Sequence, residues 1–136
     1  MLKDHVYLYV EDDAMSRDAL SLVFRRIMGI ETLTVFENST DFMGRVRTMA
    51  NRPDIFLLDI HMKPHTGFEM LAMLRASEAF RDSIVIALTA SVMNEEVQML
   101  KTAGFDGVIG KPIDVEILPE LIARIVEGET VWHITS

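Results

Sequence analysis

The 136-residue sequence contains no cysteine. Disulfide bonds, thiolate metal sites and thiol nucleophiles are therefore all excluded, and the composition is compatible with a reducing compartment. The sequence also has no apolar signal segment near its start and no run of about 18 apolar residues, the length that a membrane-spanning helix needs. These absences predict a soluble, cytoplasmic protein.

Basic residues are also few. Thirteen Lys and Arg stand against twenty-one Asp and Glu, which gives a formal net charge of −8. Because a negative surplus repels phosphate backbones and anionic lipids, neither nucleic acid nor a membrane is expected as a direct partner. The chain is nevertheless 49% hydrophobic and 25% charged, which is typical of a globular domain with a real core.

Short apolar runs rich in β-branched residues alternate with longer segments whose apolar residues recur at helical spacing. This alternation is typical of βαβ units around a parallel sheet. Five strands are expected, over residues 5–11, 30–36, 54–59, 83–89 and near 108–109. A helix should follow each strand, over residues 14–28, 42–50, 68–74, 93–103 and 118–125. The sequence therefore predicts a doubly wound α/β fold with a five-stranded parallel sheet and helices on both faces.

The length fits one domain, which is expected over residues 1–128. Residues 129–136 show neither the apolar run of a strand nor the helical spacing of apolar residues, and they are expected to form a loosely ordered C-terminal tail. Trp132 in this tail either packs near the end of the domain or contacts a partner.

Polar side chains stand where four of the five expected strands end. They are Glu11, Asp12 and Asp13 after the first strand, Asp59 at the end of the third, Thr89 at the end of the fourth and Lys111 after the fifth. Functional groups collect at the carboxyl ends of the strands in open parallel sheets, so these residues are expected to meet at one edge.

This group has the composition of a site for phosphoryl transfer. Neighbouring carboxylates repel one another unless a cation is present, and oxygen ligands favour hard cations such as Mg²⁺ or Mn²⁺. A carboxylate such as Asp59 can attack phosphorus when a metal, an ammonium and a hydroxyl neutralise the developing charge. Each residue alone also has a structural alternative: Asp13 or Thr89 would cap a helix, and Lys111 would be a solvated lysine at a strand end.

The chain resembles the receiver domains of two-component response regulators from about Val6 to Val126. The resemblance is carried by Val10-Glu11-Asp12-Asp13, Leu57-Leu58-Asp59-Ile60-His61-Met62, Leu88-Thr89-Ala90 and Gly110-Lys111-Pro112, which are similar to the family's acidic, phosphoacceptor, hydroxyl and lysine motifs. The 30 residues from Asp59 to Thr89 and the 22 from Thr89 to Lys111 also agree with the family pattern.

The resemblance implies a flavodoxin-like strand order of 2-1-3-4-5 and a magnesium site. Glu11, Asp12 and Asp59 would hold Mg²⁺ together with the backbone carbonyl of His61. Asp59 would take a phosphoryl group from a histidine kinase or a histidine phosphotransfer protein, and the domain would later hydrolyse it.

The resemblance also implies roles for the residues around the phosphoacceptor. Lys111 would pair with the phosphoryl oxygens, and Thr89 would move to hydrogen-bond to them. The peptide bond before Pro112 would be cis, a form that only X-Pro bonds adopt readily. Output would pass to an unidentified protein through the fourth helix, fifth strand and fifth helix, and dimerisation on phosphorylation is left open.

Several positions depart from the family pattern. Val108 stands three residues before the lysine, where the family usually has Tyr or Phe, so signalling must use another readout. Lys63 stands where proline is expected, with Pro64 one place later, so a different loop path is expected there. His61 and Ser91 occupy positions that tune dephosphorylation in this family.

Three other functions would also be compatible with parts of this sequence. A degenerate receiver would act only as an interaction module, which Val108 favours and the intact acidic and lysine positions oppose. A phosphatase of the haloacid-dehalogenase type would need an Asp where His61 stands. A flavodoxin-type flavin carrier would need a hydroxyl- and glycine-rich loop after the first strand, where the acidic residues stand instead.

Overall fold

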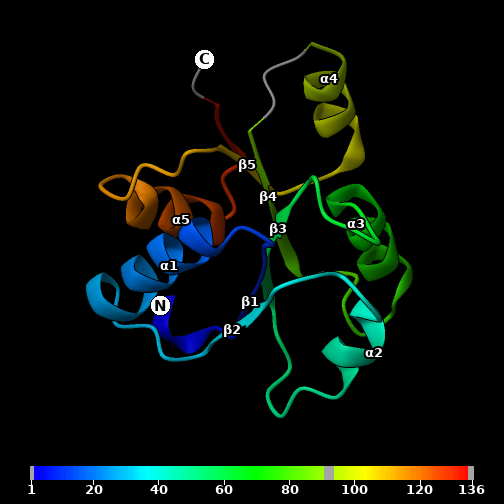
Figure 1. Ribbon diagram of the computed structural model, residues 1–136, viewed down its shortest axis with the longest axis horizontal. Coiled ribbons are helices and arrows are strands. Elements are labelled where there is room, and N and C mark those ends of the chain that lie inside the picture. Colours follow the sequence, from blue (N-terminus) through cyan, green and yellow to red (C-terminus); the bar gives the residue numbers. More distant parts are fainter. Residues whose placement is uncertain (1, 91–93, 135–136) are drawn as a thin grey trace.

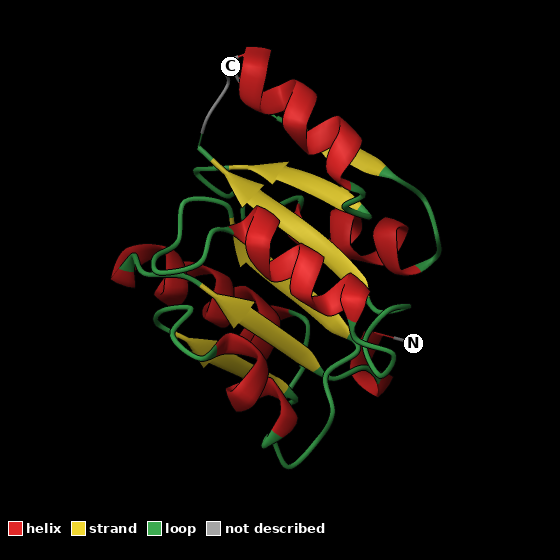
Figure 2. Ribbon diagram, turned by 90° about the vertical axis from the view of Figure 1, so that its right-hand side faces the viewer, coloured by secondary structure: helices red, strands yellow, loops and turns green. Residues whose placement is uncertain are grey.

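The computed structural model describes residues 2–90 and 94–134. Its centre is one parallel sheet with the strand order β2-β1-β3-β4-β5-β6, which Figure 2 shows as a twisted layer flanked by helices. The strands are β1 (Tyr7–Val10), β2 (Leu33–Phe36), β3 (Ile55–Asp59), β4 (Ile84–Thr89), β5 (Gly107–Gly110) and β6 (Val131–His133). The predicted fold class and the order 2-1-3-4-5 are confirmed, but the sheet has six strands rather than five.

Helices lie on both faces of the sheet. They are α1 (Ala14–Leu22), which continues into a π-helical turn (Val23–Ile27), α2 (Phe42–Arg47), α3 (Gly67–Ala76), α4 (Asn94–Ala103) and α5 (Leu118–Val126), after a short 3-10 turn at Leu2–Asp4. In Figure 1, α1 and α5 lie on one side of the strands, and α2, α3 and α4 lie on the other. None of the helices in the described part of the chain is both long and apolar enough to cross a membrane.

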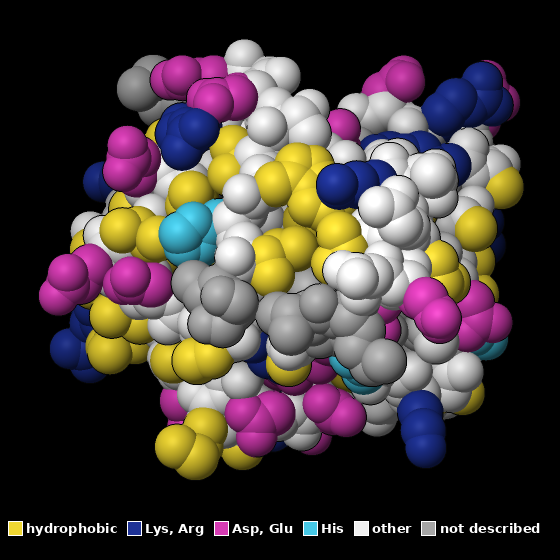
Figure 3. All heavy atoms as spheres, turned by 90° about the horizontal axis from the view of Figure 1, so that it is seen from above, with side chains coloured by type: hydrophobic (Ala, Val, Ile, Leu, Met, Phe, Trp, Pro, Cys, Tyr) yellow, Lys and Arg dark blue, Asp and Glu magenta, His cyan; other side chains and the backbone are white. Residues whose placement is uncertain are grey.

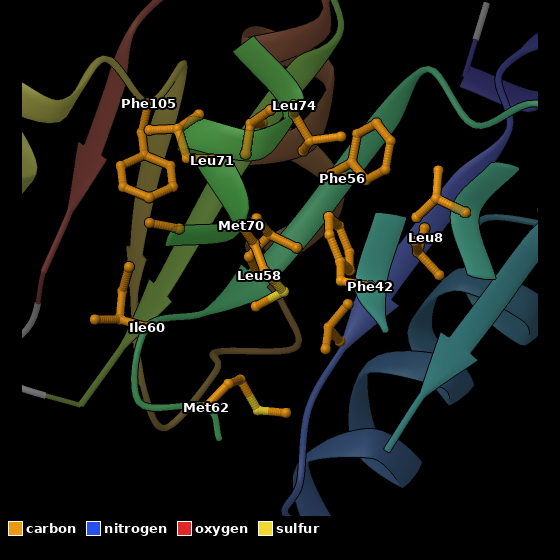
Figure 4. Close-up of a cluster of buried hydrophobic side chains, with 14 of the residues drawn as sticks. Leu8, Phe42, Phe56, Leu58, Ile60, Met62, Met70, Leu71, Leu74 and Phe105 are labelled. Carbon is orange, nitrogen blue, oxygen red and sulfur yellow. The ribbon is translucent and has the colours of Figure 1, made fainter. Parts of the chain in front are cut away.

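The central strands are buried on both faces because alternate side chains enter different clusters. In β3, Ile55 and Leu57 pack with α1 and α5, whereas Phe56 and Leu58 pack with α2 and α3. Figure 4 shows the second cluster, in which Phe56 and Leu58 face side chains of α2 and α3 such as Phe42. Each fully buried side chain of this size stabilises the fold by about 1.5–3 kcal/mol, which holds the ends of the strands in fixed positions.

The C-terminal segment forms a strand instead of the loosely ordered tail that was expected. In β6, Val131 pairs with Gly107 and Trp132 pairs with Val108, both in parallel register. Val131 is buried, and Trp132 packs against the same cluster as Val108. Trp132 therefore packs on the domain, the first of its two predicted alternatives. β6 also occupies the edge of β5, within the face that was expected to contact partners.

Candidate functional site

The carboxyl ends of four strands bring the predicted site residues to one edge of the sheet. Asp59 ends β3 and pairs with Leu88 of β4, so Thr89 is the next residue along that strand. Lys111 follows β5, and its backbone N–H donates to the Thr89 carbonyl at 2.8 Å. Glu11 follows β1, on the other side of β3. Residues far apart in the sequence are thus neighbours, as the strand pattern predicts.

Three carboxylates form the acidic part of the site. Oxygens of Glu11, Asp12 and Asp59 all lie within 4.8 Å of one another. Glu11 is fully buried and Asp59 nearly so, whereas Asp12 is exposed to solvent. This donor set consists of oxygen atoms, and one exposed carboxylate leaves access from solvent. Both properties suit Mg²⁺ or Mn²⁺, which prefer oxygen ligands and keep several waters.

The ammonium of Lys111 lies between two of these carboxylates. Its Nζ is 2.9 Å from Glu11 Oε1 and 3.3 Å from Asp59 Oδ2. The Lys111 side chain is only 15% exposed, so Lys111 is not a solvated lysine at a strand end. A buried carboxylate is costly unless it is paired, and Lys111 supplies the pairing charge.

The close packing of these groups changes their pKa values. Burial, followed by the contact with Asp59, raises the pKa of Glu11 to about 7, although Lys111 opposes this change. Burial alone would lower the pKa of Lys111, but its hydrogen bond to Glu11 and the charge of Asp59 raise it instead. The hydroxyl of Tyr9 donates to Glu11 Oε1 at 3.2 Å. Burial and the charge of Glu11 raise the pKa of Tyr9, so this donor stays protonated.

A fourth carboxylate, Glu96 of α4, reaches the site and was not predicted. Its Oε1 accepts a hydrogen bond from Thr89 Oγ1 at 3.1 Å and lies 3.0 Å from His61 Nε2. The backbone N–H of His61 in turn donates to Asp59 Oδ1 at 3.1 Å. Acidic residues in the first turn of a helix are common because they interact favourably with the helix dipole, so Glu96 gave no separate signal in the sequence.

Other predicted features have mixed outcomes. Asp13 accepts a hydrogen bond from the backbone N–H of the third residue of α1, so its alternative as a helix cap is confirmed. The peptide bond before Pro112 is cis, as predicted, and the bond between the exposed Lys63 and Pro64 is cis as well. Ser91 lies outside the described residues.

Comparison with known proteins gives consistent matches. The family model of the response regulator receiver domain matches residues 7–123. The polar-differentiation response regulator DivK of Brucella anthropi is 33% identical over 118 residues, which cover 85% of this chain and 90% of that protein. The nitrate/nitrite response regulator protein homolog of Haemophilus influenzae is 27% identical over 124 residues, which cover 91% of this chain and 58% of that protein. The chain spans between 5% and 50% of the length of four further curated relatives.

A solved structure of the chemotaxis response regulator CheY4 of Vibrio cholerae has a TM-score of 0.77 at 23% identity. The match covers 89% of this chain and 98% of that chain, and at this identity it shows the fold alone. The family model, by contrast, extends from β1 into α5 and includes every strand end that carries the site. The chain therefore belongs to the response regulator receiver domain family.

Proposed function

We propose that Asp59 accepts a phosphoryl group and that this domain signals by protein contact. The observation that carries the proposal is the setting of the Asp59 carboxylate, which is nearly buried and lies 3.3 Å from the Lys111 ammonium. A carboxylate can attack phosphorus where fixed positive charge and hydrogen-bond donors stabilise the developing negative charge. Asp59 has an ammonium beside it and the Thr89 hydroxyl on the adjacent strand end.

The proposed metal ligands are Glu11, Asp12, Asp59 and the backbone carbonyl of His61. The proposal is supported by the carboxylate oxygens, which lie within 4.8 Å of one another and are of the kind that hard cations prefer. When bound, Mg²⁺ would neutralise negative charge on the phosphoryl oxygens. The same oxygen ligands also suit Mn²⁺.

The chain's own residues account for the other requirements of the transfer. An oxygen of Asp59 bonds to phosphorus while the P–N bond of a phosphohistidine breaks, and the imidazole nitrogen keeps the electron pair. Lys111 pairs with the phosphoryl oxygens, and Thr89 donates a hydrogen bond to them. In the later hydrolysis a water oxygen bonds to phosphorus and the Asp59 carboxylate leaves.

A histidine kinase or a histidine phosphotransfer protein is the proposed donor, since phosphohistidine matches this chemistry and the family. The proposed output is contact with a further protein. Figure 3 shows the surface seen from above, where hydrophobic side chains lie among acidic and basic ones.

Intact-mass spectrometry after incubation with acetyl phosphate, with and without Mg²⁺, tests the proposal. The wild-type protein should gain the mass of one phosphoryl group only when Mg²⁺ is present. Asp59→Asn should abolish the gain, whereas Asp18→Asn, which changes an exposed Asp of α1, should retain it. Absence of any gain in the wild-type protein would instead favour a receiver that acts only as an interaction module.

A further inference from the structure

Glu96 joins α4 to the two segments that flank the proposed phosphoacceptor. Its Oε1 accepts a hydrogen bond from Thr89 Oγ1 at 3.1 Å and lies 3.0 Å from His61 Nε2. Thr89 follows the residue that pairs with Asp59, and the backbone N–H of His61 donates to the Asp59 carboxylate. The Glu96 side chain is only 20% exposed and Thr89 is buried, so their hydrogen bond is largely shielded from water, whereas the His61 side chain is 57% exposed.

A phosphoryl group on Asp59 would compete directly with Glu96. Such a group carries up to about two negative charges near neutral pH. Repulsion between like charges is strong where water is partly excluded, so Glu96 opposes the arrival of this group. The Thr89 hydroxyl also has a single proton, which it cannot donate to Glu96 and to a phosphoryl oxygen at the same time.

We propose that Glu96 is a positioning residue that holds α4 against Thr89 and His61 until Asp59 is phosphorylated. In the unphosphorylated domain the Glu96 carboxylate ties α4 to the site and slows phosphorylation. Once the phosphoryl group draws the Thr89 hydroxyl away and repels Glu96, α4 is released. This inference rests on the proposed function. It assigns the link between the phosphoacceptor site and the surface of α4 to the contacts of Glu96 rather than to Val108.

The other end of α4 provides an optical readout of its position. Lys101 Nζ lies 5.8 Å from the centroid of the Trp132 ring, within the range of a cation–π contact. Trp132 is the single tryptophan of the sequence, so the fluorescence of the protein's indole comes from this position alone. Because Glu96 and Lys101 lie on the same helix, release of Glu96 moves the ammonium relative to the indole.

The first part of the test measures the rate of phosphorylation by acetyl phosphate with Mg²⁺. Glu96→Gln removes the charge but keeps an oxygen that accepts the Thr89 hydrogen bond. We expect this variant to gain the phosphoryl group faster than the wild-type protein, on the order of threefold. Glu95→Gln removes the same charge from the exposed neighbouring side chain and should leave the rate unchanged.

The second part measures Trp132 fluorescence without any phosphodonor. Glu96→Ala removes both the charge and the hydrogen-bond acceptor, so its emission spectrum should already be shifted toward that of the phosphorylated wild-type protein. Glu95→Ala should keep the wild-type spectrum. Thermal unfolding of each variant verifies that the fold is intact, and the phosphorylation rate of Glu96→Gln decides the matter if Glu96→Ala fails to fold.

The outcomes separate this inference from the proposed function. If the wild-type protein is phosphorylated but Glu96→Gln reacts no faster than Glu95→Gln, the role of Glu96 is overturned and the phosphoacceptor role stands. If no protein is phosphorylated, the proposed function fails. In that case a Glu96→Ala spectrum identical to the wild-type spectrum also overturns the proposed hold on α4.

Discussion

At the scale of single residues, Lys111 explains how two buried carboxylates remain together before a cation binds. Its ammonium contacts both Glu11 and Asp59, and removal of one partner from a buried ion pair generally leaves a costly unpaired charge. Asp12 completes the acidic group but remains exposed. Lys111 therefore places a positive charge between the two buried carboxylates, and the exposed Asp12 leaves the proposed magnesium site open to solvent.

Binding of Mg²⁺ should stabilise the folded protein, because the unfolded chain does not hold the three carboxylates together. At ten times the dissociation constant, the expected gain in the free energy of unfolding is about 1.4 kcal/mol. Asp12→Asn should lose most of this gain. Denaturant unfolding at increasing Mg²⁺ concentration measures the effect.

Asp13→Asn is the matched control for that experiment. Asp13 caps α1 and lies beside Asp12 in the sequence, and asparagine is an equally good helix cap. Its response to Mg²⁺ should remain that of the wild-type protein. The assignment of Asp12 as a ligand would be contradicted if Mg²⁺ stabilised Asp12→Asn as much as the wild-type protein. It would also be contradicted if both variants lost the same share of the stabilisation by Mg²⁺.

Tyr7 should make the stability of the fold depend on alkaline pH. Burial, and next the negative charge of Asp54, raise the pKa of Tyr7 to about 12. A tyrosine in an unfolded chain has a pKa of about 10, so the folded protein holds the proton of Tyr7 more tightly than the unfolded chain does. The contribution of Tyr7 to the free energy of unfolding is thus fully present below about pH 10 and is lost as the pH rises through about 12.

Tyr7→Phe isolates this contribution. Its free energy of unfolding should decrease less than that of the wild-type protein between about pH 9 and about pH 11, because no phenol at this position can ionise. Urea titrations at several pH values measure the difference. Equal decreases in the two proteins would show that Tyr7 has its ordinary pKa in the folded state.

At the scale of elements, the long apolar strands were predictable and the short terminal strand was not. β3 is buried at every position, and its run of apolar residues indicated a central strand. β6 has only three residues, too few for a pattern to distinguish a strand from a tail. Its place in the sheet depends on pairing with β5, a tertiary contact that the local sequence does not encode.

Val131 tests the contribution of β6 to stability. The side chain is 4% exposed, so Val131→Ala removes buried methyl groups and should lower the free energy of unfolding by about 2 kcal/mol. Val115→Ala makes the same change at a side chain that is 41% exposed, where the expected effect is within about 0.5 kcal/mol. Urea unfolding of the two variants measures both changes in the free energy of unfolding. Equal small decreases would mean that β6 adds little to stability.

At the scale of the whole molecule, the parallel topology explains why much of the candidate site could be predicted. Once the strands were identified, their carboxyl ends had to meet at one edge, and Asp59 and Lys111 had to become neighbours. Glu96 could not be found in this way because it reaches the site from a helix. Which side chains of α4 face the site depends on how that helix packs, and periodicity does not determine this.

If Asp59 is the phosphoacceptor, chemical trapping of the acyl phosphate should locate the modification at this residue. An acyl phosphate on an aspartate is reduced by borohydride to homoserine, which tandem mass spectrometry of peptides can place in the sequence. After incubation with acetyl phosphate and Mg²⁺, homoserine should be found at position 59 and at no other aspartate. Homoserine at a different aspartate, or none in a protein whose fold is verified, would contradict the assignment of Asp59 as the phosphoacceptor.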